Sequence, residues 1–240
     1  MMPFDSRRRE VLAGLGGLLV AGCAGTPMGG TAGPPVPAPD LRVGDRWTYH
    51  ISDGFRMPVV WDEIHELIAA GPGGYTLRVT GKGPTTEFTR TEQWSAPGVI
   101  LSGPVMDRET RPFSPPMERY RFPLTGGESW SQMFAIAPDK TANNGRLTRH
   151  VRVGGFSNIT TPAGTFNAIG LRIIMQVDDE EFWRTQTECN YVVWYAPEVG
   201  AMVHEEKQAS YREKGGMDMT SQIRSQYAFL DLTSFTRGAR

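Results

Sequence analysis

The sequence has no long hydrophobic run, few cysteines and almost no net charge. No apolar stretch reaches the roughly 18–20 residues that a membrane-spanning helix needs. Two cysteines in 240 residues exclude a disulfide-rich scaffold. A formal net charge of −1 excludes a strongly basic protein that binds nucleic acid. With 39% hydrophobic residues, the chain has the composition of an ordinary globular protein.

Motifs for catalysis, metal binding and cofactor binding are also missing. The sequence has no GxSxG elbow, no SxxK, no HExxH and no phosphate-binding loop. Its four histidines lack metal-ligand spacing and are expected to face solvent: His50, His65, His150 and His204. The acidic run Asp178–Glu181 lacks the spacing of a calcium loop and predicts a solvated hairpin tip. Cys189 is expected to be a buried, inert thiol. No catalytic residue, metal ligand or cofactor is therefore predicted, and we do not expect an enzyme.

The N-terminus, in contrast, is rich in signals for export. Arg7 to Arg9 form a positively charged start, and apolar or small residues follow from Val11 to Val20. This order is typical of a cleaved signal peptide, which we place over residues 1–22. The segment Ser6–Leu12 also resembles a twin-arginine signal, which would imply folding before export. A general secretion leader is the alternative, and the sequence leaves both routes open.

The end of this leader, Val20-Ala21-Gly22-Cys23, resembles the lipobox of bacterial lipoproteins. The resemblance implies cleavage between Gly22 and Cys23 and a diacylglycerol on the sulfur of Cys23. A thiolate is the natural nucleophile for such an alkylation. The next residue is Ala24 rather than aspartate, which in that family favours the inner leaflet of the outer membrane, facing the periplasm. The inner membrane stays possible, because this sorting rule varies among bacteria.

The mature chain divides into a tether and one β domain. Residues 23–40 comprise the acylated cysteine and a Gly- and Pro-rich stretch without periodicity, which predicts a flexible tether. Over residues 41–240 apolar and polar residues alternate, most clearly in 169–177, 183–195 and 217–229, as in antiparallel strands. We predict a mainly β fold, either an antiparallel curved sheet or an open or partly closed β-barrel. Two similar sheet halves, with a seam near residues 103–123, are a further possibility.

Three short motifs resemble those of several uncharacterised bacterial exported-protein families. Gly44–Tyr49 is similar to their GxxWxY opening, Pro162–Ala168 to PAGTFxA and Trp194–Gly200 to WYxPxxG. The resemblance implies a curved antiparallel sheet or open barrel in the periplasm and carries over no catalytic residue. Gly164 and Gly200 are predicted to supply a positive φ at tight turns.

Together these patterns lead to a functional hypothesis without a defined activity. We expect a lipid-anchored, periplasm-facing lipoprotein, a binding or scaffolding module whose partners are the membrane, through acylated Cys23, and an envelope protein. A carrier or sensor of an apolar ligand in a β half-barrel is the first alternative. A hydrolase with an unrecognised site is the second. An apolar trough would favour the carrier, a filled core the interaction module, and a histidine–carboxylate pair in a cleft the hydrolase.

Overall fold

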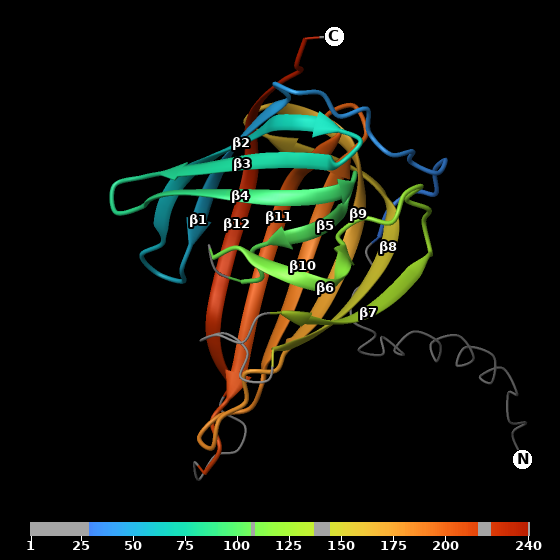
Figure 1. Ribbon diagram of the computed structural model, residues 1–240. Coiled ribbons are helices and arrows are strands. Elements are labelled where there is room, and N and C mark those ends of the chain that lie inside the picture. The colour runs from blue at the N-terminus through green and yellow to red at the C-terminus, as the bar shows by residue number, and fades with distance from the viewer. Residues whose placement is uncertain (1–28, 107–108, 137–144, 216–221, 240) are drawn as a thin grey trace, which may run out of the picture.

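The protein forms a closed antiparallel β-barrel of twelve strands (Figure 1). The computed structural model describes residues 29–106, 109–136, 145–215 and 222–239. Its strands are β1 (Arg46–Asp53), β2 (Val59–Gly71), β3 (Gly74–Lys82), β4 (Glu87–Ala96), β5 (Val99–Gly103), β6 (Arg111–Glu118), β7 (Ser129–Ile136), β8 (Arg146–Thr161), β9 (Gly164–Val177), β10 (Thr187–Ala196), β11 (Ala201–Arg212) and β12 (Gln222–Thr236). Each strand pairs with its sequence neighbours, and β1 pairs with β12 to close the barrel. The predicted mainly β, antiparallel fold is confirmed. Among the described residues, no helix is long and apolar enough to cross a membrane.

Alternation of side chains along the strands builds the interior of the barrel. Successive residues of a strand point to opposite faces, so every second residue faces inward. On β9 the inward residues are at most 5% exposed: Ile169, Leu171, Ile173, Met175 and Val177. On β10 the corresponding buried residues are Cys189, Tyr191, Val193 and Tyr195. Both sets agree with the alternation in the sequence.

The predicted alternation is wrong at two places. β10 begins at Thr187 and not at Trp183, because Glu181 and Arg184 pair in a tight turn ahead of it. On β12 the inward residues are of the opposite parity to the predicted ones: Ala228, Leu230 and Leu232. Tyr227 instead stacks on Phe55, with 5.3 Å between the ring centroids. Residues 217–221 of the predicted stripe lie outside the described residues.

The acidic segment before β10 is only in part the solvated tip that the sequence predicts, because Glu180 is exposed but Asp179 is not. Asp179 is buried, and its carboxylate accepts hydrogen bonds from the backbone N–H and hydroxyl of Thr187, at 2.6 and 2.7 Å. Arg184 Nη2 donates to the same carboxylate at 2.6 Å. Asp179 therefore fixes the start of β10 rather than facing water.

Aromatic side chains close one end of the barrel. Tyr120, Phe122 and Tyr195 pack together, with ring centroids 5.1 to 5.9 Å apart. Nearby, Trp47 Nε1 donates a hydrogen bond to the carbonyl of Val199 at 3.1 Å. Large aromatic groups therefore occupy much of the interior at this end.

The second half of the expected tether packs against this barrel. Val36 and Leu124 exchange two backbone hydrogen bonds of 2.8 and 2.9 Å, and both side chains are buried. Thr31 and Phe156 form a second such pair, with both bonds at 2.9 Å. Residues 29–40 therefore form a docked strap, because backbone pairing holds a segment that has too few apolar residues to pack by itself. Cys23, Gly22 and the signal peptide lie outside the described residues.

Residues 103–123 are the segment expected to contain a seam between two sheet halves. They comprise the last residue of β5, the loop between β5 and β6, β6 itself and the first residues after it. β6 pairs with β7 through only two residue pairs, Phe113 with Ile136 and Ser114 with Ala135. This is the shortest ladder in the barrel among the described residues. The division of the domain into two similar halves stays a prediction.

Gly200 offers a test of the turn geometry. Gly164 and Gly200 have φ angles of +136° and +71°. A Cβ at Gly200 would also lie only 3.3 Å from Pro39 Cβ. We expect Gly200→Ala to lower the free energy of unfolding by about 1–2 kcal/mol, because an L-residue is strained at this φ. Equilibrium unfolding in urea measures this loss. Gly73→Ala is the matched control, since a Cβ there meets nothing within 4 Å. Equal effects of the two substitutions would contradict the assigned strain.

Candidate ligand-binding site

A cavity of about 510 Å³ lies inside the barrel. This volume is within the range of about 300–1,000 Å³ that is usual for small-molecule sites. Strands from both sides of the barrel line it, together with the loop between β5 and β6. The lining includes Glu109, whose side chain is 73% exposed, so the cavity reaches solvent beside this loop.

Much of the cavity wall is apolar. Buried aliphatic and methionine side chains from seven strands line it, among them Ile51, Ile100, Met117, Leu147, Ile173, Met175, Met202 and Leu230. These side chains do not meet across the lumen, so they leave apolar surface that a ligand can cover. Unbranched methionines adapt readily to the shape of such a ligand.

One side of the cavity carries a group that we call the acidic cluster: Glu63, His65, Arg90 and Glu92. Glu63 accepts hydrogen bonds from Trp61 Nε1 and shares another with His65 Nε2, both at 2.9 Å. Arg90 lies between the two carboxylates, 3.4 Å from Glu63 and 3.3 Å from Glu92. Burial alone would raise the pKa of Glu63, but the hydrogen bond and charge of His65, and the charge of Arg90, outweigh it and lower the pKa far below its ordinary value.

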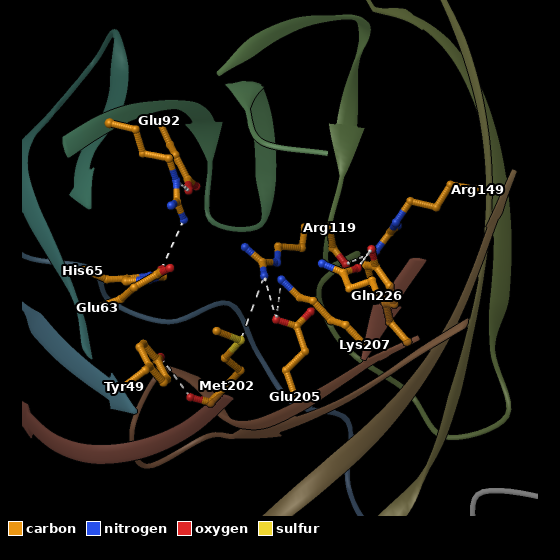
Figure 2. A network of polar contacts seen from close by, with 12 residues as sticks. Tyr49, Glu63, His65, Glu92, Arg119, Arg149, Met202, Glu205, Lys207 and Gln226 are labelled. Atoms are coloured by element: carbon orange, nitrogen blue, oxygen red, sulfur yellow. Dashed lines mark hydrogen bonds and ion pairs between the residues drawn. The ribbon is translucent and has the colours of Figure 1, made fainter. Parts of the chain in front are cut away.

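A second group, the basic cluster, consists of Arg119, Arg149, Lys207 and Glu205. Figure 2 shows Arg119 between the acidic cluster and Glu205. Arg149 follows the inward stripe of β8 and donates hydrogen bonds to the carbonyls of Glu118 and Arg119, at 2.8 and 3.2 Å. Burial and the positive charge of Arg119 lower the pKa of Arg149 to about 9, so this guanidinium is still charged at neutral pH. For Arg119, burial acts to lower the pKa, but Tyr120, Glu205 and Glu92 raise it above its ordinary value.

Glu205 is the single carboxylate among these three cations. Its Oε2 atom is buried and has no hydrogen-bond partner. Lys207 Nζ lies 3.3 Å away and Arg119 Nη2 3.8 Å away, within ion-pair distance but without the geometry of a hydrogen bond. Native proteins give nearly all buried polar atoms a hydrogen-bond partner, so this oxygen, which has ion pairs but no hydrogen bond, stands out in the cavity wall.

A smaller cavity of about 50 Å³ lies toward the aromatic end. His65, Arg119 and Met202 line both cavities and therefore separate them. Tyr49 helps to hold Met202 in this position between the cavities, because its hydroxyl donates a hydrogen bond of 3.0 Å to the carbonyl of Met202.

The structure corrects the expected position of one histidine. His65 is buried inside the barrel, although the sequence favours a solvent-facing position. The other three have polar partners outside the cavity: His50 with Asp62, His150 with Ser131 and His204 with Asp231. Cys189 is buried as expected, and burial raises its pKa to about 12.

The pair of His65 and Glu63 is the histidine–carboxylate arrangement that would favour a hydrolase. Among the described residues that line the cavity, however, there is no serine, threonine or cysteine that the pair could activate. Glu63 is also a weak base, because its pKa is lowered. Within the described residues, no three His, Cys, Asp or Glu side chains converge as a metal site. What the geometry supports best is binding.

None of the residues of the two clusters was singled out as a site from the sequence, apart from His65. A signal is present: charged residues occur at every second position within otherwise apolar stripes. Trp61-x-Glu63-x-His65 on β2 and Leu147-x-Arg149-x-Val151 on β8 are examples. Such a charge must face the interior, where it is costly unless it is paired or functional.

Comparisons with known proteins give structural similarity only. The sequence matches no protein-family model and no curated protein. A "putative lipoprotein" from Parabacteroides distasonis is similar in structure, with a TM-score of 0.47 and 12% identity, covering 85% of this chain and 100% of that chain. A "putative exported protein with YmcC-like fold" from Bacteroides fragilis has a TM-score of 0.41, 12% identity and the same coverage. At these values neither similarity carries a function over to this chain.

The lowered pKa of Glu63 makes a prediction about stability and pH. The unfolded carboxyl has a pKa of about 4.3, so acidification through that value protonates the unfolded chain first and destabilises the fold. We expect Glu63→Gln to cost about 1.5–3 kcal/mol at pH 7, because charge-assisted hydrogen bonds are lost. The difference from wild type should shrink as the pH falls from about 5 to about 3.

Urea unfolding at several pH values checks this expectation. Glu66→Gln is the matched control, since Glu66 lies on the outer face of the same strand and pairs with Arg78 at 2.7 Å. An exposed pair of this kind contributes about 0–1 kcal/mol. A constant difference between Glu63→Gln and wild type at all pH values would refute the assigned electrostatics.

Proposed function

We propose that this protein is a lipid-anchored lipoprotein of the bacterial cell envelope that binds a small amphipathic ligand inside its barrel. In this proposal the acylated Cys23 holds it in the inner leaflet of the outer membrane, facing the periplasm. The barrel is the carrier or sensor domain. The observation that carries the binding function is the cavity of about 510 Å³, which combines an apolar wall with buried charges and reaches solvent.

The cavity distinguishes this proposal from a pure scaffolding module. A scaffold needs a filled core, because each empty volume in a core costs stability. Here the inward side chains of several strands end at a shared space, and some of them carry charge. A ligand with both an apolar part and a polar part matches such a wall better than a purely apolar one does. This refines the apolar ligand expected from the sequence.

The docked strap limits how far the barrel sits from its proposed anchor. Residue 29 is the first described residue, and Thr31 is already paired with Phe156. An extended chain spans at most about 3.6 Å per residue, so Cys23 lies within about 22 Å of residue 29. The barrel is therefore held close to the bilayer surface in this proposal.

A filled cavity should abolish ligand binding. Ala228 faces the cavity from β12 and is 3% exposed. We expect Ala228→Phe to weaken binding of the uncharged fluorescent probe N-phenyl-1-naphthylamine by about tenfold or more, because a ring occupies ligand space. Fluorescence titration measures this. Ala135→Phe on β7, at an exposed position, is the matched control. If wild type binds neither this probe nor any dodecyl amphiphile, whether neutral, anionic or cationic, the proposed function is wrong.

The anchor is tested separately with Cys23→Ser. Each buried methylene of an acyl chain contributes about 0.8 kcal/mol, so loss of two chains removes stable membrane association. We expect the variant to leave the outer-membrane fraction while keeping the β-rich circular dichroism of the wild type. Fractionation after a high-salt wash is the measurement. Retention of the variant in the outer-membrane pellet would show that Cys23 is not the anchor.

A further inference from the structure

The charges inside the barrel are unevenly distributed. In the acidic cluster, Arg90 lies between two carboxylates and contacts both. In the basic cluster, Arg119, Arg149 and Lys207 carry three positive charges against the one carboxylate of the cluster, Glu205, and Glu92 of the acidic cluster also acts on Arg119. The basic cluster therefore has an excess of positive charge that the acidic cluster lacks. Buried charge without a counter-charge is costly, so the basic side favours an anionic occupant.

The cations of the basic cluster form no strong hydrogen-bonded ion pair with Glu205 Oε2. No hydrogen bond joins Glu205 Oε2 to Lys207 or Arg119, although both lie within 4 Å. Arg119 Nη2 also lies 3.9 Å from the sulfur of Met202, and the guanidinium lies 5.9 Å from the ring of Tyr120 and forms a hydrogen bond with the Tyr120 side chain. An arginine has five N–H donors, so these contacts leave donors for a ligand. A guanidinium and an ammonium at one wall of a cavity are suited to carboxylate and phosphate groups.

Apolar surface continues directly from this charged group. Met117, Leu147 and Met202 line the same cavity as Arg119 and Lys207. A ligand bound there places its charged end on the cations and its remaining part against these side chains. The volume of about 510 Å³ is far larger than a carboxylate or phosphate group needs, so the charged end alone does not fill the site.

We propose that the basic cluster binds the carboxylate or phosphate end of an amphiphile whose alkyl or acyl chain lies along the apolar wall of the barrel. This inference rests on the proposed function, since it names the class of ligand for the same cavity. Arg119 and Lys207 contact the anion. Arg149 contributes positive charge, while its own donors stay on the carbonyls of Glu118 and Arg119. Glu205 competes with the ligand for the cations and so limits its affinity.

The first experiment compares ligands that share one chain and differ in charge. The full chain with Cys23→Ser, kept free of detergent, is loaded with N-phenyl-1-naphthylamine. The probe is then displaced with dodecanoate, dodecyl phosphate, dodecanol or dodecyltrimethylammonium. We expect dodecanoate or dodecyl phosphate to bind about 10- to 100-fold tighter than dodecanol, because the anion forms charge-assisted hydrogen bonds that the alcohol cannot form. The comparison of dodecanoate with dodecyl phosphate shows whether the site prefers a carboxylate or a phosphate group.

The second experiment changes the charges one at a time. Arg119→Met and Lys207→Met should each weaken binding of the preferred anion about tenfold and leave dodecanol binding unchanged. Glu205→Gln should strengthen anion binding, a gain that damage to the fold cannot produce. Arg78→Met is the matched control, because Arg78 lies on the outer face and pairs with Glu66.

The outcomes separate this inference from the proposed function. Binding of dodecanol and the anions with equal affinity, unchanged by Arg119→Met, Lys207→Met and Glu205→Gln, overturns the anionic ligand and leaves the binding function standing. Preferential binding of dodecyltrimethylammonium overturns it as well. Failure of the probe and of all four amphiphiles to bind overturns both proposals. Probe binding by each variant reports that its barrel is intact.

Discussion

The pairing of β1 with β12 is the constraint on which the rest of this structure depends. It joins the ends of a twelve-stranded sheet and gives every strand an inner face. An eight-stranded barrel is just wide enough for its own side chains to fill, and diameter grows with strand number. A barrel of twelve strands therefore leaves space that inward residues of ordinary size do not fill. The aromatic group of Tyr120, Phe122 and Tyr195 closes one end of that space, and the remainder is the cavity.

Because the barrel is closed, charged residues at inward positions of its strands lie around this shared space. Apolar residues at positions such as Glu63 and Arg149 would stabilise a barrel at least as well, because buried ion pairs seldom repay their desolvation. Arg149 is satisfied by two carbonyls and Glu63 by three side chains, so each is held in a fixed place. Fixed charges beside unfilled apolar surface are what a specific small-molecule site requires. Glu205, whose Oε2 atom accepts no hydrogen bond, is the exception, and it lies where we place the ligand.

The sequence predicts the strands well and the interior poorly, for physical reasons. Period-two stripes on β9 and β10 are long and apolar, so their inward faces are readily identified. On β12 the bulky residues Tyr227 and Phe229 lie on the other face from Ala228, Leu230 and Leu232, and size alone suggests the wrong parity. His65 looks like a surface residue beside Glu66, whereas its relevant neighbour is Glu63, two residues earlier on the same face. Convergence of Glu63, Arg119 and Glu205 depends on barrel closure, which no local pattern encodes.

The strap and the mouth of the cavity lie toward opposite ends of β1, which gives the anchored protein a direction. Trp47, near the start of the strand, lines the small cavity together with Pro39 of the strap and with Leu41, which follows it. Asp53, the last residue of the strand, lines the large cavity together with Glu109 at its exposed edge. A strap that holds the closed end near the proposed lipid anchor leaves the mouth facing away from that end. In the proposed function, ligand exchanges at this exposed edge of the cavity, beside Asp53 and Glu109. In the same proposal, an anionic amphiphile that enters there passes Asp53 and Glu109 before it reaches Arg119 and Lys207, so the charge of the described residues along its path changes from acidic at the exposed edge to basic inside.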